Sequence, residues 1–144
     1  MDTEKSFEEL AKDPKGIIYH HEKKEGYDFI ILKGPASLCA YFVINKDHPL
    51  ANHNENLLPV SCHGGFTYSG TGVQGMNVKD KWVYGWDYSH AGDFSFYDLD
   101  YPGEWRNNDK KWTVKQIIAD AWEAQIDFEN LLRLAEEIWN KKEK

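Results

Sequence analysis

Two histidines and two aspartates with the chemistry of an active site lie between positions 63 and 93: His63, Asp87, His90 and Asp93. The last three are spaced at intervals of three residues, so a turn over residues 89–92 would bring them together. Neutral imidazole and carboxylate groups are ligands for divalent transition metals, and an aspartate beside a histidine is equally an acid–base pair. The pattern therefore predicts a metal site of all four residues or a catalytic site of His63, Asp87 and His90. The third interpretation is a hydrogen-bond network that only braces the loops.

A glycine pair directly after His63 marks a second group of candidates. Glycines are needed where the backbone takes a positive φ or where another group approaches it closely, and backbone N–H groups at such a corner can face an anion. We therefore expect a small polar, nucleotide-like ligand at this place. The residues predicted to contact this ligand are His48, Gly64, Gly65, Thr67, Tyr68 and Asp93.

The two cysteines, Cys39 and Cys62, offer little support for thiol chemistry. They make neither a disulfide framework nor a CxxC metal pattern, and predict buried thiols in a reducing compartment. A nucleophilic Cys62 activated by His63 is disfavoured, because neighbouring residues of a strand point to opposite faces. A P-loop and a GxSxG elbow are absent from the sequence, which leaves triphosphatase and α/β-hydrolase interpretations unsupported.

Several segments before residue 112 have the periodicity of strands. Residues 16–20 and 27–32 predict a β-hairpin, and the nearly continuous apolar run over 38–45 predicts a strand covered on both faces. Shorter strands are expected at 57–63 and 66–69.

The segment 81–88 alternates cleanly and predicts a further strand. Its aromatic residues then share one face, most simply beneath a helix: Trp82, Tyr84, Trp86 and Tyr88.

Helices are expected at the two ends of the chain. A short one is predicted over residues 3–12. At the other end, Thr113 and Gln116 form a capping box, and apolar residues then recur at spacings of three and four. They predict an amphipathic helix of about 27 residues, with 125–127 as the place for a bend or for a break into two helices.

These elements predict an α+β fold: a twisted antiparallel sheet of about five or six strands, a long C-terminal helix packed on one face and a short N-terminal helix. The length of 144 residues suits a single domain. We divide it into an N-terminal extension over 1–15, a sheet with its loops over 16–111 and the C-terminal helix over 112–142.

The net charge of −7 bears on the partners. The 17 basic residues of the chain form no continuous stripe, which argues against direct nucleic-acid binding. The sequence carries no secretion signal and no apolar run of membrane-spanning length, so a cytoplasmic protein without a membrane partner is expected.

Three motifs in order resemble a family of small bacteriophage and prophage proteins of uncharacterised function. They are His48-Pro49-Leu50, the segment His63 to Tyr68, which fits HGG-[FL]-T-Y, and Gly85 to Asp93, which fits G-[FW]-D-x-x-H-x-G-D. The resemblance covers roughly residues 38–140 and implies a phage-encoded accessory protein in the cytoplasm of a host bacterium. This chain has Tyr88 where many relatives have Cys, which disfavours a thiolate ligand there.

Two functions of different classes follow. The first is binding, with or without hydrolysis, of the small polar ligand, and a divalent metal is the one cofactor that the site suggests. The second is an anti-CRISPR-like antagonist that binds a host defence protein through an acidic, aromatic-rich surface. The residues of that surface would be Asp98, Asp100, Glu104 and Trp105.

Overall fold

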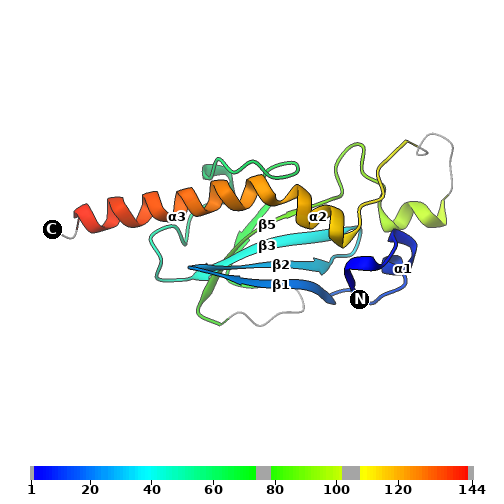
Figure 1. Ribbon diagram of the computed structural model, residues 1–144, viewed down its shortest axis with the longest axis horizontal. Helices are drawn as coiled ribbons and strands as arrows, with labels where there is room; N and C mark the ends of the chain where they lie inside the picture. Colours follow the sequence, from blue (N-terminus) through cyan, green and yellow to red (C-terminus); the bar gives the residue numbers. More distant parts are fainter. Residues whose placement is uncertain (1, 74–78, 102–107, 143–144) are drawn as a thin grey trace.

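The computed structural model describes residues 2–73, 79–101 and 108–142, and shows a twisted five-stranded antiparallel sheet with helices across one face (Figure 1). The strands, in the spatial order β1-β2-β3-β5-β4, are β1 Ile18–Lys24, β2 Tyr27–Lys33, β3 Leu38–Asn45, β4 Tyr68–Gly70 and β5 Lys81–Asp87. The α-helices are α1 Phe7–Ala11, α2 Val114–Asp120 and α3 Trp122–Lys142. Short 3₁₀ turns lie at Asp2–Glu4, Glu55–Leu57 and Phe96–Asp100. The predicted α+β fold is confirmed.

The predicted hairpin and third strand are present, although β1 runs from Ile18 to Lys24 instead of over 16–20. β1 and β2 pair across a turn at Gly26, whose φ of +89° suits glycine. β3 has the predicted bounds and pairs with β2 on one side and β5 on the other. The predicted strand at 57–63 is wrong. Pro59 offers no N–H there, and the backbone bonds of Val60 and Cys62 reach only two residues back, so this segment pairs with no neighbouring strand.

The C-terminal helical segment is two helices, and their junction is at Ala121 rather than at 125–127. The capping box at Thr113 is confirmed, with both of its hydrogen bonds to Gln116 present. The helix stays intact through 125–127 because Gln125 is itself buried and bonds back to Ala121. Phe128 then anchors the helix by stacking on Phe42, with ring centroids 4.5 Å apart.

The core lies between the helices and one face of the sheet. As predicted, the aromatic residues of the β5 segment share this face: Tyr84, Trp86 and Tyr88 are buried and Trp82 is half-buried. Removing a buried aromatic side chain such as Phe128 would cost about 3–5 kcal/mol. The opposite face of the sheet carries a smaller apolar cluster: Ile30, Leu32, Val43, Val73 and Val83.

The chain after β5 is tied to the start of the helical segment. Phe94 N–H donates to Lys110 O, and Lys110 N–H donates to Gly92 O, both at 2.8 Å. These bonds bring Trp112, which precedes α2, alongside the loop that follows β5. The loop residues of the predicted site are therefore held between a strand end and a helix start.

Candidate functional site

Asp93 is a buried carboxylate at the centre of the predicted site. It is 5% exposed, although an unpaired aspartate at such a position would be unfavourable. Its Oδ1 accepts a hydrogen bond from Trp112 Nε1 at 2.8 Å. Its Oδ2 accepts one from His90 N at 2.9 Å and lies 2.7 Å from His63 Nε2. Asp93 is thus fully hydrogen-bonded and fixes three segments of the chain to one another.

His63 is held in one orientation by Asp93 and by the rings of Tyr88, His90 and Trp112. Its ring stacks on Tyr88 with centroids 4.7 Å apart and meets the Trp112 ring edge-on at 5.1 Å. Because an ionised carboxylate only accepts, Nε2 carries the proton when the imidazole is neutral, and Nδ1 keeps its lone pair. Nδ1 has no hydrogen bond to the described residues. The arrangement is that of a histidine general base with an orienting aspartate.

His90 and Asp87 form a second, more local pair. His90 Nε2 lies 3.3 Å from Asp87 Oδ1, but the two atoms do not have hydrogen-bond geometry. This buried nitrogen therefore has no hydrogen-bond partner among the described residues. Asp87 Oδ1 instead accepts from Ser89 N at 3.1 Å. Gly64 packs against the His90 ring: a Cβ added at Gly64 would lie 2.4 Å from His90 Nε2. Gly64 therefore meets both conditions that require glycine, the close approach of another group and a positive φ, here +76°.

A pocket of about 520 Å³ opens beside His63. It lies where the irregular segment after the 3₁₀ turn at Glu55–Leu57 meets the junction of α2 and α3. The lining residues are Ser61, Cys62, His63, Ala119, Asp120, Trp122 and Glu123. Ligand sites are typically such concave places with a few convergent polar groups.

Two side chains of the pocket wall, Asp120 and Cys62, are characterised by a hydrogen bond and by a raised pKa, respectively. Asp120 Oδ2 accepts a hydrogen bond from the Tyr88 hydroxyl at 2.7 Å, and this hydroxyl in turn accepts from Trp86 Nε1. Burial, reinforced by the nearby Asp120 charge, raises the pKa of the Cys62 thiol to about 12. A thiol with that pKa is protonated at neutral pH, which agrees with the expectation that Cys62 is not a nucleophile.

The four predicted metal ligands divide into the pairs His63–Asp93 and His90–Asp87. Within the described part of the chain, no group of three or more His, Cys, Asp or Glu side chains is arranged to hold a metal ion. Both oxygens of Asp93 are already engaged by hydrogen-bond donors. The geometry therefore gives the metal alternative no support and leaves two alternatives, an acid–base site and a hydrogen-bond network that braces the loops.

Several residues predicted to contact the ligand are not among those that line the pocket beside His63. His48 Nε2 lies 2.9 Å from Glu136 Oε1, on a turn of α3 about 20–25 Å along the helix from Asp120. Thr67 N–H donates to Gly85 O, and the Tyr68 hydroxyl donates to Gly72 O. Gly65 N–H is engaged by Cys62 O at 3.0 Å, so it is not free to hold an anion.

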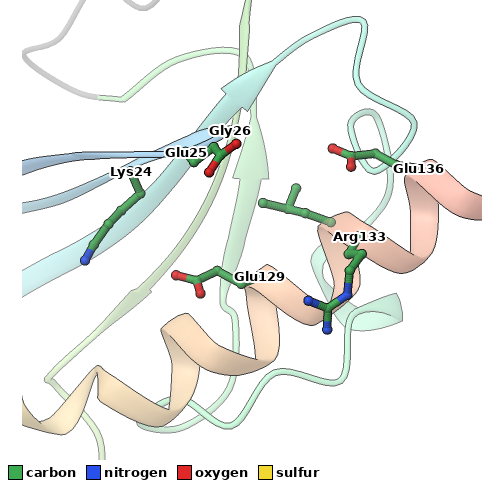
Figure 2. Close-up of a pocket in the computed structure, with 7 residues that line it drawn as sticks. Lys24, Glu25, Gly26, Glu129, Arg133 and Glu136 are labelled. Carbon is green, nitrogen blue, oxygen red and sulfur yellow. The ribbon is translucent and has the colours of Figure 1, made fainter.

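A second pocket, of about 400 Å³, lies between the β1–β2 turn and the middle of α3 (Figure 2). Its wall mixes charges of both signs, with Lys24 and Arg133 among three glutamates. Glu136 lies between this pocket and His48. None of the residues predicted for the site lines it.

The acidic surface proposed for a protein partner falls partly on the 3₁₀ turn Phe96–Asp100. Asp98 Oδ2 accepts from Ser95 N at 2.9 Å and so caps this turn, whereas Asp100 is exposed. Glu104 and Trp105 lie outside the described residues.

Sequence reasoning missed the aromatic and acidic residues around His63: Tyr88, Trp112, Asp120, Trp122 and Glu123. Tyr88 was predicted only as part of the aromatic face of 81–88 and nothing was predicted for Trp112, because their stacking on His63 depends on how the loops fold. Trp122 had a signal, since a large apolar residue on the polar side of an amphipathic helix has no place in the core.

Residues 70–75 also spell the dinucleotide-binding pattern G-x-G-x-x-G. That pattern acts in a βαβ unit with parallel strands. Here β4 and β5, which flank it, pair antiparallel. The pattern therefore gives no support to dinucleotide binding.

No protein-family model, curated protein or solved structure matches this chain. In the part of the chain that the structure describes, no helix combines the length and apolar character needed to span a bilayer.

Proposed function

We propose that the pocket beside His63 binds a small polar ligand and that His63 acts there as a general base. The observation that carries the proposal is the buried Asp93 that holds His63 Nε2 at 2.7 Å while the ring faces a pocket. The resemblance of the sequence to small phage and prophage proteins supports an accessory role in an infected bacterium. The ligand class proposed for this role is a nucleotide-like compound.

In the proposed reaction, His63 Nδ1 accepts a proton from a water molecule or from a ligand hydroxyl. Asp93 stabilises the imidazolium that results and is a positioning residue, because its carboxylate is already engaged by His63, His90 and Trp112 in the described structure. Tyr88 keeps the imidazole plane fixed by stacking. A positioned base of this kind contributes about 10²–10⁴-fold to a rate.

The test is hydrolysis of a panel of nucleotides and nucleosides by the wild type and by His63→Gln. We expect one member to be hydrolysed, with a loss of about 100-fold or more in the variant. His90→Gln is the matched control, since it removes the other histidine of the site and should keep the rate within about threefold. Equal losses in both variants would argue that the residues form a structural network only.

A second candidate function is binding to a host defence protein. The observation that favours it is a pair of exposed aromatic residues beside the acidic turn: Tyr97 is 58% and Tyr101 is 78% exposed, and Asp100 lies between them. Exposed tyrosines are common anchors of protein interfaces. In a pull-down from host lysate at low salt, a partner captured by the wild type should be lost with Tyr97→Ala and Tyr101→Ala combined, but retained by His63→Gln.

A further inference from the structure

The pocket beside His63 is acidic, which bears on the class of its ligand. Asp120 and Glu123 contribute carboxylates, and His63 is the one basic side chain among the lining residues. The hydrogen bond from the Tyr88 hydroxyl at 2.7 Å fixes Asp120 in the wall. An anionic ligand would meet two carboxylates at short range, and like charges repel most strongly where water is partly excluded.

The glycine pair does not supply the anion-binding corner that its sequence suggested, and the helix junction adds a further negative charge. Gly65 N–H is taken by Cys62 O. Ala121, at the junction of the two helices, keeps a right-handed helical backbone, and its N–H donates to Ile117 O at 2.8 Å. A hydrogen-bonded turn at Ala121 therefore joins the two helices, and Glu123 places a carboxylate in the first turn of α3, where it opposes a second negative charge.

Trp122 adds a flat apolar surface at the same place. It is 64% exposed, although an indole of this size is normally covered. It lines the pocket between Asp120 and Glu123. An indole face binds a planar group by stacking and attracts a cation through its ring quadrupole.

We propose that the ligand group entering this pocket is a planar cation, of the amidinium, guanidinium or protonated-heterocycle class. It would stack on Trp122, donate hydrogen bonds to Asp120 and Glu123, and present its reactive end to His63. The inference rests on the proposed function in that it takes the same pocket as the ligand site. It replaces the anionic ligand expected from the glycine pair with a cationic one.

The experiment uses three probes of one shape and different charge: benzamidinium, benzamide and benzoate. Binding to the full chain is followed by NMR chemical shifts of the Trp122 indole N–H at low salt. We expect benzamidinium to bind about tenfold more tightly than benzamide, benzoate to give no shift, and added salt to weaken benzamidinium. A benzoate affinity equal to or above that of benzamidinium would overturn the proposal, as would the absence of binding by all three probes.

Two pairs of variants localise the effect. Trp122→Ala and Glu123→Gln should each weaken benzamidinium binding by about fivefold or more. Trp139→Ala and Glu137→Gln are matched controls on the exposed end of α3, where Trp139 is 51% exposed, and should leave it unchanged. Equal weakening in the controls would show non-specific association and would also contradict the proposal.

Failure of the cationic-ligand proposal and failure of the proposed function can be distinguished, because the probe experiment tests the first and the hydrolysis assay tests the second. Benzamidinium binding without any His63-dependent reaction would leave a cation site and remove the general base. A His63-dependent hydrolysis of an anionic nucleotide without benzamidinium binding would keep the proposed function and remove the cationic ligand.

Discussion

The two histidine–aspartate pairs contain the same residue types and each borders a pocket, but they differ in burial and in hydrogen bonding. In the pair His63–Asp93 the carboxylate is buried, both of its oxygens accept hydrogen bonds, and the imidazole lies beside a pocket. In the pair His90–Asp87 the carboxylate is about one-third exposed and bonds to its own turn, while the imidazole nitrogen is buried without a hydrogen bond to the described residues.

This difference follows from how each pair is assembled. Asp87 and His90 are three residues apart and meet through a local turn. His63 and Asp93 are 30 residues apart and meet only because β4 and β5 pair and Lys110 ties down the loop after β5 that carries Asp93. A pair that the whole fold constructs can be held rigidly, and rigidity is what a positioned general base requires.

The largest difference between the pairs should be in stability. Asp93→Ala leaves the Trp112 indole N–H and the His90 backbone N–H buried without an acceptor, and should lower the free energy of unfolding by about 3–5 kcal/mol. Asp87→Ala removes a partly exposed contact and should cost less than about 1 kcal/mol. Urea denaturation of both variants measures the comparison. Similar losses would contradict the central role given to Asp93.

The glycine pair provides the next comparison. Gly64→Ala forces a Cβ against the His90 ring and strains a φ of +76°, and should cost about 2–4 kcal/mol. Gly65→Ala has the same φ but open space around the new Cβ, so about 1–2 kcal/mol is expected. Thermal and urea unfolding give both values. A Gly65→Ala variant as unstable as Gly64→Ala would show that backbone strain alone matters, and that packing on His90 does not.

The smallest expected effect concerns the two thiols, one beside each pair. Burial raises the pKa of Cys62 to about 12 and that of Cys39 to about 11. Since both values lie above the ordinary value for a thiol, stability from the neutral thiols is present below about pH 9 and is lost as pH rises toward 11–12. At pH 7.5 alkylation by iodoacetamide should be about 100-fold slower than for a free thiol, and should accelerate with pH. Rapid alkylation of Cys62 at neutral pH would revive the thiol chemistry that we discount.

The sequence predicted the parts of the fold that depend on local pattern. The hairpin, β3 and the alternating aromatic strand β5 follow directly from periodicity, as does the capping box at Thr113. The strand predicted at 57–63 failed because Pro59 and two-residue turns outweigh its apolar residues. The break predicted at 125–127 is absent because Gln125 is buried and stays helical, and the junction lies at Ala121 instead.

The sequence singled out the residues of the two histidine–aspartate pairs but not how they pair. The spacing of Asp87, His90 and Asp93 suggested that they converge, and His63 was singled out beside them. The sequence could not show that His63 would take Asp93 as its partner, or that His48 would lie beside Glu136 instead. Those contacts join positions far apart in the chain, and only the register of the sheet and the placement of α3 decide them.

The most direct measurement of the account is the protonation pattern of the two imidazoles, read from long-range ¹H–¹⁵N correlation spectra of the full chain at neutral pH. We predict that neutral His63 is the Nε2–H tautomer, with an unprotonated Nδ1, and that this preference disappears in Asp93→Asn. A His63 that carries its proton on Nδ1, or that shows no preference between the two nitrogens, would contradict the assignment of His63 as a general base oriented by Asp93.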